Sequence, residues 1–298
     1  MPLSGSPTAI LPAAESGRVC AVASRAQCEV REWSARYDGL FGAKPFDLNL
    51  FNMVCFCTAF SAPWLGSAAL RMTNRVAVWS FGADWLIDYV ATSQGEVSDL
   101  VARCLAVADG APPDADDLTR GLADIRNGLA SSAAFPALRE VWREELRRFL
   151  DAMAREWDWN AARADGSACP PSFEEYLGNT DNLGFSFAFV SHWIATSPPP
   201  PAADIAGIVA ASREAQRTMR LINDLGTYER DVSWGDLNAL MLDVTEQQVR
   251  EHLTAIGGRF RTLLDPLRAD HPQLASYMER QVDFYDAFLG LTDYWGAL

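Results

Sequence analysis

The feature that most constrains the fold is a set of polar side chains spaced four residues apart in the stretch 220–231. Asn223, Thr227 and Asp231 stand at positions i, i+4 and i+8. Residues four apart lie one turn above each other on an α-helix, so the spacing predicts a helix with one polar stripe. Amide, hydroxyl and carboxylate oxygens are hard ligands that Mg²⁺ accepts beside water and phosphate. A polar face on a surface helix would show the same spacing, so a second signal is needed.

A pair of acids in an apolar stretch, residues 67–91, supplies that second signal. Asp84 and Asp88 are again four residues apart, among many aromatic and aliphatic neighbours. An ionised carboxylate is costly to bury unless it is paired or bound to a metal. Two such groups on one face of an apolar helix therefore indicate a nearby cation. The alternative is that both carboxylates face solvent while the aromatic side chains face the core.

Together the two motifs resemble those of class I terpene synthases. Residues 84–88 (DWLID) resemble the aspartate-rich DDxxD motif of that family, with Trp85 in place of the second acid. Residues 223–231 (NDLGTYERD) resemble its ND(L/I/V)x(S/T)xxxE motif, with the last Glu shortened to Asp. The order and separation of the motifs also fit, so the resemblance covers roughly residues 20–298. It implies an all-α fold, a single-domain helical bundle with a central apolar cavity.

The resemblance also implies a set of metal ligands and a reaction. Asp84 and Asp88 would bind Mg²⁺ on one side of the cavity, and Asn223, Thr227 and Asp231 would bind it on the other. Three ions are expected in all. Metal ions neutralise the charge that develops on a departing diphosphate, so an allylic diphosphate can ionise to a carbocation. The implied partner is an isoprenyl diphosphate substrate.

A second group of residues is expected to contact the diphosphate. Arg230 precedes the last ligand and would donate to it, and Arg220 lies one turn before the first ligand, which predicts a further contact. Family members sense the diphosphate with an Arg and an Asp ahead of a Gly that breaks a helix. Here Asn179 and Asn182 take the places of the Arg and the Asp, and Gly184 keeps the break. An Asn side chain can still donate a hydrogen bond.

Below the metal ions, a carbocation requires a dry cavity whose aromatic faces stabilise it by cation–π contact. The aromatic residues expected to line this cavity are Phe81, Trp85, Phe185 and Tyr294. Relatives also reach the diphosphate with an Arg-Tyr pair near the C-terminus, and this sequence has no such pair.

The exact version of the second motif bears on the substrate. The Thr-Tyr-x-Arg sequence at residues 227–230 resembles that of bacterial diterpene cyclases, which implies cyclisation of geranylgeranyl diphosphate to a diterpene hydrocarbon or alcohol. A sesquiterpene cyclase that uses farnesyl diphosphate is the near alternative. A different class stays open, because Trp85 and Asn179 depart from the family pattern. In that alternative, the chain is a non-catalytic helical protein that binds an isoprenoid or a protein partner.

Composition and charge restrict the kinds of molecule that this chain is expected to bind. The 298 residues are 49% hydrophobic and carry a net charge of −14, which argues against nucleic acid or an anionic membrane surface. The six cysteines lack zinc-site spacing, and no apolar run reaches the length of a membrane span. We therefore expect a cytoplasmic protein, and a homodimer is one expected state. Residues 1–16, rich in Pro, Ser and Ala, are expected to form a flexible arm before a single domain at 17–298.

Other helices are expected from the apolar periodicity and its breaks. They are placed at about 17–37, 49–60, 96–109, 135–157, 203–232, 245–267 and 273–291. Residues 114–117 (DADD) formally match the DxDD motif of class II cyclases. Because prolines precede these acids and an apolar helix follows them, we interpret them as a helix N-cap instead.

Overall fold

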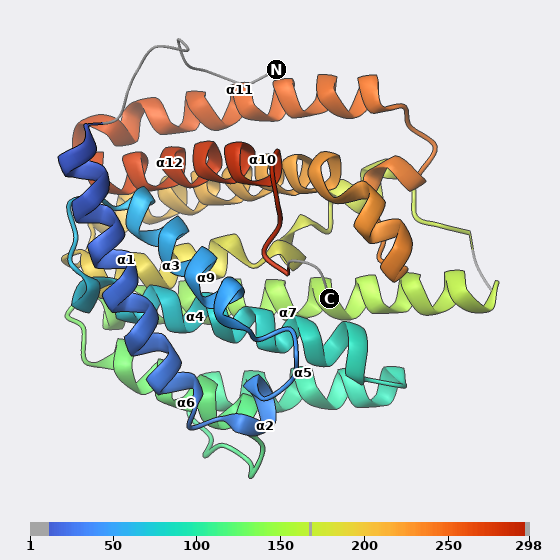
Figure 1. Cartoon of the computed structure of the whole chain (residues 1–298), viewed down its shortest axis with the longest axis horizontal. Helices are drawn as coiled ribbons and strands as arrows, with labels where there is room; N and C mark the ends of the chain where they lie inside the picture. The colour runs from blue at the N-terminus through green and yellow to red at the C-terminus, as the bar shows by residue number, and fades with distance from the viewer. Residues whose placement is uncertain (1–11, 167–168, 296–298) are drawn as a thin grey trace.

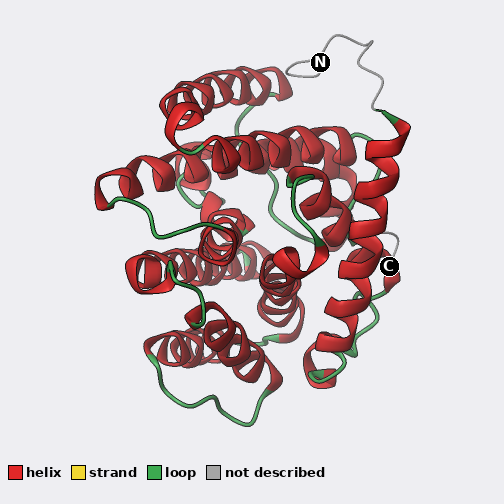
Figure 2. Cartoon of the chain, turned by 90° about the vertical axis from the view of Figure 1, so that its left-hand side faces the viewer, coloured by secondary structure: helices red, strands yellow, loops and turns green. Residues whose placement is uncertain are grey.

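The computed structural model of the chain describes residues 12–166 and 169–295, and every regular element in them is helical (Figure 2). The α-helices, labelled in Figure 1, are α1 (Ala13–Ser34), α2 (Asp38–Phe41), α3 (Leu48–Ser61), α4 (Ser67–Trp85), α5 (Gln94–Asp109), α6 (Asp117–Ala130), α7 (Phe135–Asp165), α8 (Phe173–Leu177), α9 (Phe185–Thr196), α10 (Ala202–Trp234), α11 (Glu246–Asp270) and α12 (Pro272–Leu289). Three short helical turns are η1 (Leu86–Val90), η2 (Thr180–Leu183) and η3 (Ala239–Met241). The expected all-α fold is confirmed.

The ends of several helices differ from those expected. Helix α1 begins at Ala13, so residues 13–16 of the expected arm are helical, while residues 1–11 lie outside the described residues. Helix α7 continues to Asp165, well past the expected end at 157, because Ala and Arg residues there favour a helix. The short elements α8 and η2 were not expected, since neither is long enough to show a helical period.

Helix α9 occupies the centre of the bundle and connects the helices that carry the two motifs. It contacts α4, α7 and α10, while α10 also packs on α11 and α12. The largest core side chains include Trp33, Trp79 and Trp142, which are almost completely buried. Their indole N–H groups donate to a carboxylate, a backbone carbonyl and a hydroxyl. Because each buried donor has an acceptor, these rings contribute apolar area without leaving a polar group unsatisfied.

A π-helical turn follows the first acid of the aspartate motif. Helix α4 ends at Trp85, and in η1 the N–H of Ala91 donates to the carbonyl of Leu86 at 2.8 Å, five residues back. The chain therefore holds one more residue in this turn than an α-helix would. The expected single helix over 67–91 is thus an α-helix that ends in a wider turn, and Asp88 lies within that turn.

The acids at 114–117 are structural, as the sequence indicated. Asp116 caps α6, because its Oδ1 accepts from the backbone N–H of Thr119 at 2.9 Å. Its Oδ2 accepts from Arg103 at 2.5 Å. Asp117 accepts from the backbone N–H of Gly39 at 2.8 Å.

Replacing Asp116 by alanine is expected to lower the free energy of unfolding by about 1–2 kcal/mol, the usual cost of a lost N-cap. Catalytic activity should be unchanged, because Asp116 does not line the cavity described below. Urea unfolding and a turnover assay would check both results, with the exposed Asp114→Ala as the matched control. An inactive but folded Asp116→Ala protein would contradict the structural role.

None of the described helices combines the length and the apolar character needed to cross a bilayer.

Candidate active site

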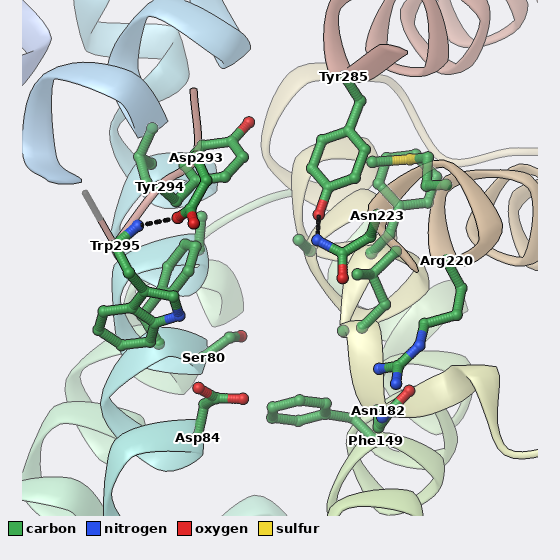
Figure 3. A pocket seen from close by; sticks show the side chains of 18 of the residues that line it. Ser80, Asp84, Phe149, Asn182, Arg220, Asn223, Tyr285, Asp293, Tyr294 and Trp295 are labelled. Atoms are coloured by element: carbon green, nitrogen blue, oxygen red, sulfur yellow. Dashed lines mark hydrogen bonds between the residues drawn. The ribbon is translucent and has the colours of Figure 1, made fainter. Parts of the chain in front are cut away.

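A cavity of about 210 Å³ lies between the two motif-bearing helices. Its walls come from α3, α4, η1, α7, α9, α10, α12 and the segment 293–295. Figure 3 shows Asp84 on the α4 wall, with Asn223 and Arg220 on the opposite wall. Much of the remaining lining is apolar, from side chains such as Phe149 and Met219. Polar side chains of α4 and α10 therefore lie on opposite sides of the cavity, and much of the lining between them is apolar.

The two acids of the first motif both line the cavity and lack hydrogen-bond partners. Among the described residues, no donor contacts either carboxylate, and Oδ1 of Asp88 is buried without any partner. Burial, then the charges of Asp236 and Glu156, raise the pKa of Asp84 to about 7. Burial and the charge of Asp84 hold the pKa of Asp88 well above its ordinary value. The first motif thus places at the cavity two carboxyl groups that lack hydrogen-bond donors, in surroundings that favour their protonated form.

The α10 stripe is brought together as its spacing predicted. Asn223 and Asp231 line the cavity, whereas Thr227 is buried behind them. The Thr227 hydroxyl lies 2.8 Å from the carbonyl of Asn223 and 2.7 Å from Oδ2 of Asp231. Asp231 also accepts from Asn238 at 2.8 Å and from Arg230 at 2.7 Å. The amide nitrogen of Asn223 donates to Tyr285 at 3.3 Å, so its carbonyl oxygen points into the cavity (Figure 3).

Both arginines line the cavity, and both are engaged by acids. Arg230 pairs with Asp231 and, at 2.8 Å, with Asp293. Its guanidinium carbon lies 5.1 Å from the centre of the Trp234 ring. These contacts fix the Arg230 side chain between the second motif and the C-terminal segment.

Arg220 is buried in a polar network behind the second motif. Its Nε donates to the hydroxyl of Tyr176 at 2.7 Å, and Nη2 donates to the carbonyl of Leu237 at 3.1 Å. Oδ1 of Asp224 and Oε1 of Glu156 lie 3.3 and 3.4 Å from its guanidinium. Arg220 is therefore held rigidly at the cavity wall (Figure 3).

The helix break expected at Gly184 is present, but only one of the two asparagines reaches the cavity. Gly184 has φ of +70° and ends η2 just before α9. Asn182 lines the cavity and donates to Glu156. The amide of Asn179 instead donates to the carbonyl of Ala152 at 2.9 Å, and Asn179 does not line the cavity. Its position does not support the expected contact with a diphosphate.

Three of the four expected aromatic residues line the cavity, namely Phe81, Phe185 and Tyr294. Trp85 does not. Its ring stacks on Tyr89 with centroids 5.1 Å apart, and it also approaches Trp295. These contacts hold the Trp85 ring against two other aromatic rings instead of in the cavity.

Three acidic residues in the lining, Glu156, Asp236 and Asp293, were not expected from the sequence, and neither was Tyr89. Glu156 lies on the long, highly charged α7 and looks like its solvent-facing acids. Asp236 follows the end of α10, and Asp293 follows α12. Glu156 and Asp293 stand at no recognisable spacing from either motif, so only the folded chain brings them to the site.

Among the described residues, no three His, Cys, Asp or Glu side chains converge closely enough to hold one ion. This is expected for like charges that repel one another, and because Mg²⁺ takes only one or two carboxylates and keeps several waters.

The fold and the site together define a class I terpene synthase. Residues 75–256, more than half of the chain and including both motifs, match the family described as "Terpene synthase family 2, C-terminal metal binding". The chain belongs to this family, and it is an enzyme of that class. No curated protein is similar enough in sequence to match it.

Several solved structures share the fold at low sequence identity. The structure of 2-methylisoborneol synthase from Streptomyces coelicolor A3(2), in complex with Mg²⁺ and geranyl-S-thiolodiphosphate, has a TM-score of 0.72 and 16% identity, and the match covers 100% of this chain and 98% of that one. The structure of linalool/nerolidol synthase from Streptomyces clavuligerus, in complex with 2-fluorogeranyl diphosphate, has a TM-score of 0.70 and 16% identity, and the match covers 89% of this chain and 93% of that one. The structure of isoprene synthase from grey poplar leaves has a TM-score of 0.65 and 14% identity, and the match covers 90% of this chain and 53% of that one.

The stability of the metal-free chain is expected to fall as the pH rises from about 4 to about 7 because of Asp84. The pKa of its carboxyl is 3.8 ordinarily and about 7 in the fold. Over that interval the folded chain keeps a proton that the unfolded chain has lost, which favours folding at the lower pH. Urea unfolding in EDTA at pH 5 and pH 8 would measure the fall. It should be smaller in Asp84→Asn, and an identical fall in that variant would contradict the argument.

Proposed function

We propose that the chain cyclises an isoprenyl diphosphate in a Mg²⁺-dependent reaction that starts with loss of the allylic diphosphate. The observation that carries this proposal is the arrangement of the two motifs. Carboxylates that lack hydrogen-bond donors, at the end of α4 and in η1, lie across an apolar cavity from the polar stripe of α10. Such a site suits a substrate with a charged head and a long apolar tail.

Mg²⁺ fits the donors that are present. Oδ1 of Asp88 is buried without a partner, and the carbonyl oxygen of Asn223 is open to the cavity. We assign Asp84 and Asp88 to the metal ions on one side, and Asn223, Thr227 and Asp231 to the other, for three ions in all as the family resemblance implies. When bound, the ions supply the positive charge that stabilises the leaving diphosphate.

The residues of the chain itself bind the two ends of the substrate. Arg230 and Arg220 supply cationic donors at the wall of the cavity, where a diphosphate accepts charge-assisted hydrogen bonds. Phe81, Phe185 and Tyr294 surround the hydrocarbon tail, exclude water and present aromatic faces to a developing carbocation.

The length of the hydrocarbon tail is the finer part of the proposal. A cavity of about 210 Å³ lies below the range of about 300–1,000 Å³ found for most ligand pockets. Two solved structures with this fold also hold analogues of geranyl diphosphate. Both observations favour a chain shorter than geranylgeranyl diphosphate, so we propose as the substrate farnesyl diphosphate, the shorter of the two candidates that the sequence offered. Geranylgeranyl diphosphate, which the Thr-Tyr-x-Arg sequence favours, is the second candidate.

A product assay tests both parts. Purified protein is incubated with Mg²⁺ and geranyl, farnesyl or geranylgeranyl diphosphate in separate reactions, with an EDTA-treated reaction as the control. A cyclic hydrocarbon or alcohol from the farnesyl reaction alone is the expected result. Cyclic product from geranylgeranyl diphosphate would reassign the chain length, and no product from any substrate with folded protein would overturn the proposed reaction.

Replacing Asp293 by asparagine is expected to tighten the binding of inorganic pyrophosphate. Arg230 now shares its charge with Asp293 at 2.8 Å, and a diphosphate must compete for it. A hydrogen bond between charged groups contributes about 1.5–3 kcal/mol, so the gain in affinity should be about tenfold or somewhat more. Asparagine keeps the side-chain oxygen that accepts from the backbone of Trp295 at 2.6 Å. Calorimetry with Mg²⁺ and pyrophosphate measures this affinity. Weaker binding by the Asp293→Asn variant would contradict the argument that Asp293 and the diphosphate compete for Arg230.

A further inference from the structure

A third carboxylate, that of Asp236, joins the two acids of the first motif in the cavity lining. Helix α10 ends at Trp234, and the next residue, Gly235, has a φ of +86° that ends the helical path. The backbone N–H groups of Gly235 and Asp236 both donate to the carbonyl of Asp231 at 3.0 Å. Asp236 is thereby fixed just beyond the last ligand of the second motif. After burial, its charge is the strongest influence that raises the pKa of Asp84.

Tyr89 holds the Asp236 side chain in this position. It follows Asp88 in η1, and its hydroxyl donates to Oδ2 of Asp236 at 2.7 Å. The Tyr89 ring is packed on both sides, stacked on Trp85 at 5.1 Å and edge-on to Trp234 at 5.9 Å. The orientation of Asp236, which follows the second motif, is therefore set by the residue that directly follows the first motif.

The three carboxylates have almost no compensation from the protein. Of the oxygens of Asp84, Asp88 and Asp236, only Oδ2 of Asp236 accepts a hydrogen bond from a described residue. The two arginines in the lining are already engaged, Arg220 by Tyr176 and Glu156, and Arg230 by Asp231 and Asp293. Partly buried carboxylates in excess of their cationic partners either take up protons or bind a further cation.

We propose that Asp236 is an additional metal-binding residue, positioned by Tyr89, that connects the two metal-binding motifs. This inference rests on the proposed function, in which Mg²⁺ and a diphosphate occupy the cavity. The acids need not meet at one point, because each Mg²⁺ binds only one or two carboxylates and retains water. Asp236 follows Asp231 by five residues in the chain and lines the same cavity as Asp84 and Asp88, so it can ligate ions held by either motif.

Mn²⁺ binding measured by electron paramagnetic resonance tests the inference without any turnover. The full chain is titrated with Mn²⁺ in the presence of inorganic pyrophosphate. Asp236→Asn should weaken Mn²⁺ binding about 10- to 100-fold, and Tyr89→Phe, which keeps the ring and removes the hydroxyl, about 10-fold. The exposed Asp243→Asn, in the loop that follows η3, is the matched control and should bind as the unchanged chain does. Asp84→Asn serves as the reference for a lost ligand.

The outcomes separate the inference from the proposed function. Unchanged Mn²⁺ binding by folded Asp236→Asn, together with a loss in Asp84→Asn, would overturn the role of Asp236 and leave the proposed function intact. No Mn²⁺ binding by the unchanged chain with pyrophosphate would overturn the proposed function itself. Thermal melting in EDTA shows whether each variant is folded. If Asp236→Asn does not fold, Tyr89→Phe decides, since a weakened affinity supports the role and an unchanged one removes it.

Discussion

Replacing Asp84 by asparagine is expected to reduce turnover by about 10²–10³-fold, the loss typical when one preorganised stabilising group is removed from an active site. Asparagine has nearly the same shape but no charge, so it keeps the packing of α4 and loses the attraction for a cation. The Asp84 carboxylate is repelled by Asp88 and Asp236 and contacts no donor among the described residues. The metal-free variant should therefore be at least as stable as the unchanged chain.

Two measurements together make this prediction specific. A product assay at saturating Mg²⁺ gives the loss of turnover, and thermal melting in EDTA gives the stability. Asp114→Asn, at an exposed position outside the cavity, is the matched control and should change neither. If Asp84→Asn turns over at the normal rate, Asp84 is not a metal ligand. If it is inactive only because it has unfolded, the electrostatic argument is wrong.

Replacing Asn223 by alanine is expected to cause a second large loss, of about 10²-fold or more in turnover. Asn223 presents its carbonyl oxygen to the cavity, while its amide nitrogen contacts only Tyr285 at 3.3 Å. That long hydrogen bond contributes little, so alanine should lower the free energy of unfolding by no more than about 1 kcal/mol. A large catalytic loss with a small stability loss identifies a ligand and not a packing residue.

Calorimetry with Mg²⁺ and pyrophosphate would show whether the Asn223→Ala loss arises in binding. Binding should weaken in parallel with turnover, because the removed oxygen contacts the ions in our proposal. The exposed Asn127→Ala on α6 provides the matched control. Normal turnover by Asn223→Ala would show that the second motif does not supply metal ligands. Only the residues of the first motif would then remain as proposed ligands.

The polar stripe on α10 was predicted from the sequence because it depends on local geometry. Spacing on one helix decides that Asn223 and Asp231 share a stripe, and the structure places both in the cavity lining. Trp85 was misplaced because the position of its ring depends on tertiary packing, in which it stacks on Tyr89 and approaches Trp295.

The rest of the site could not be predicted, because it depends on contacts between distant segments. Glu156 receives hydrogen bonds from Asn182 and Arg220, which lie 26 and 64 residues away in the chain. Asp293 meets Arg230 over a separation of 63 residues. Asn179 is a predicted site residue that the structure places elsewhere. Its position near the helix break suggested a contact with the diphosphate, but its amide donates to a backbone carbonyl of α7. No periodicity in the sequence encodes these pairings.

The π-helical turn at Leu86–Val90 has a consequence for how relatives are aligned. Such a turn is equivalent to an α-helix with one residue inserted, and each residue of an α-helix advances the direction of its side chain by about 100°. In a homologue with an unbroken α-helix here, a different number of residues would have to separate the two acids for the second side chain to point in the same direction. Gap placement within this motif should therefore follow the backbone, because two acids with identical spacing in two sequences need not be equivalent in space.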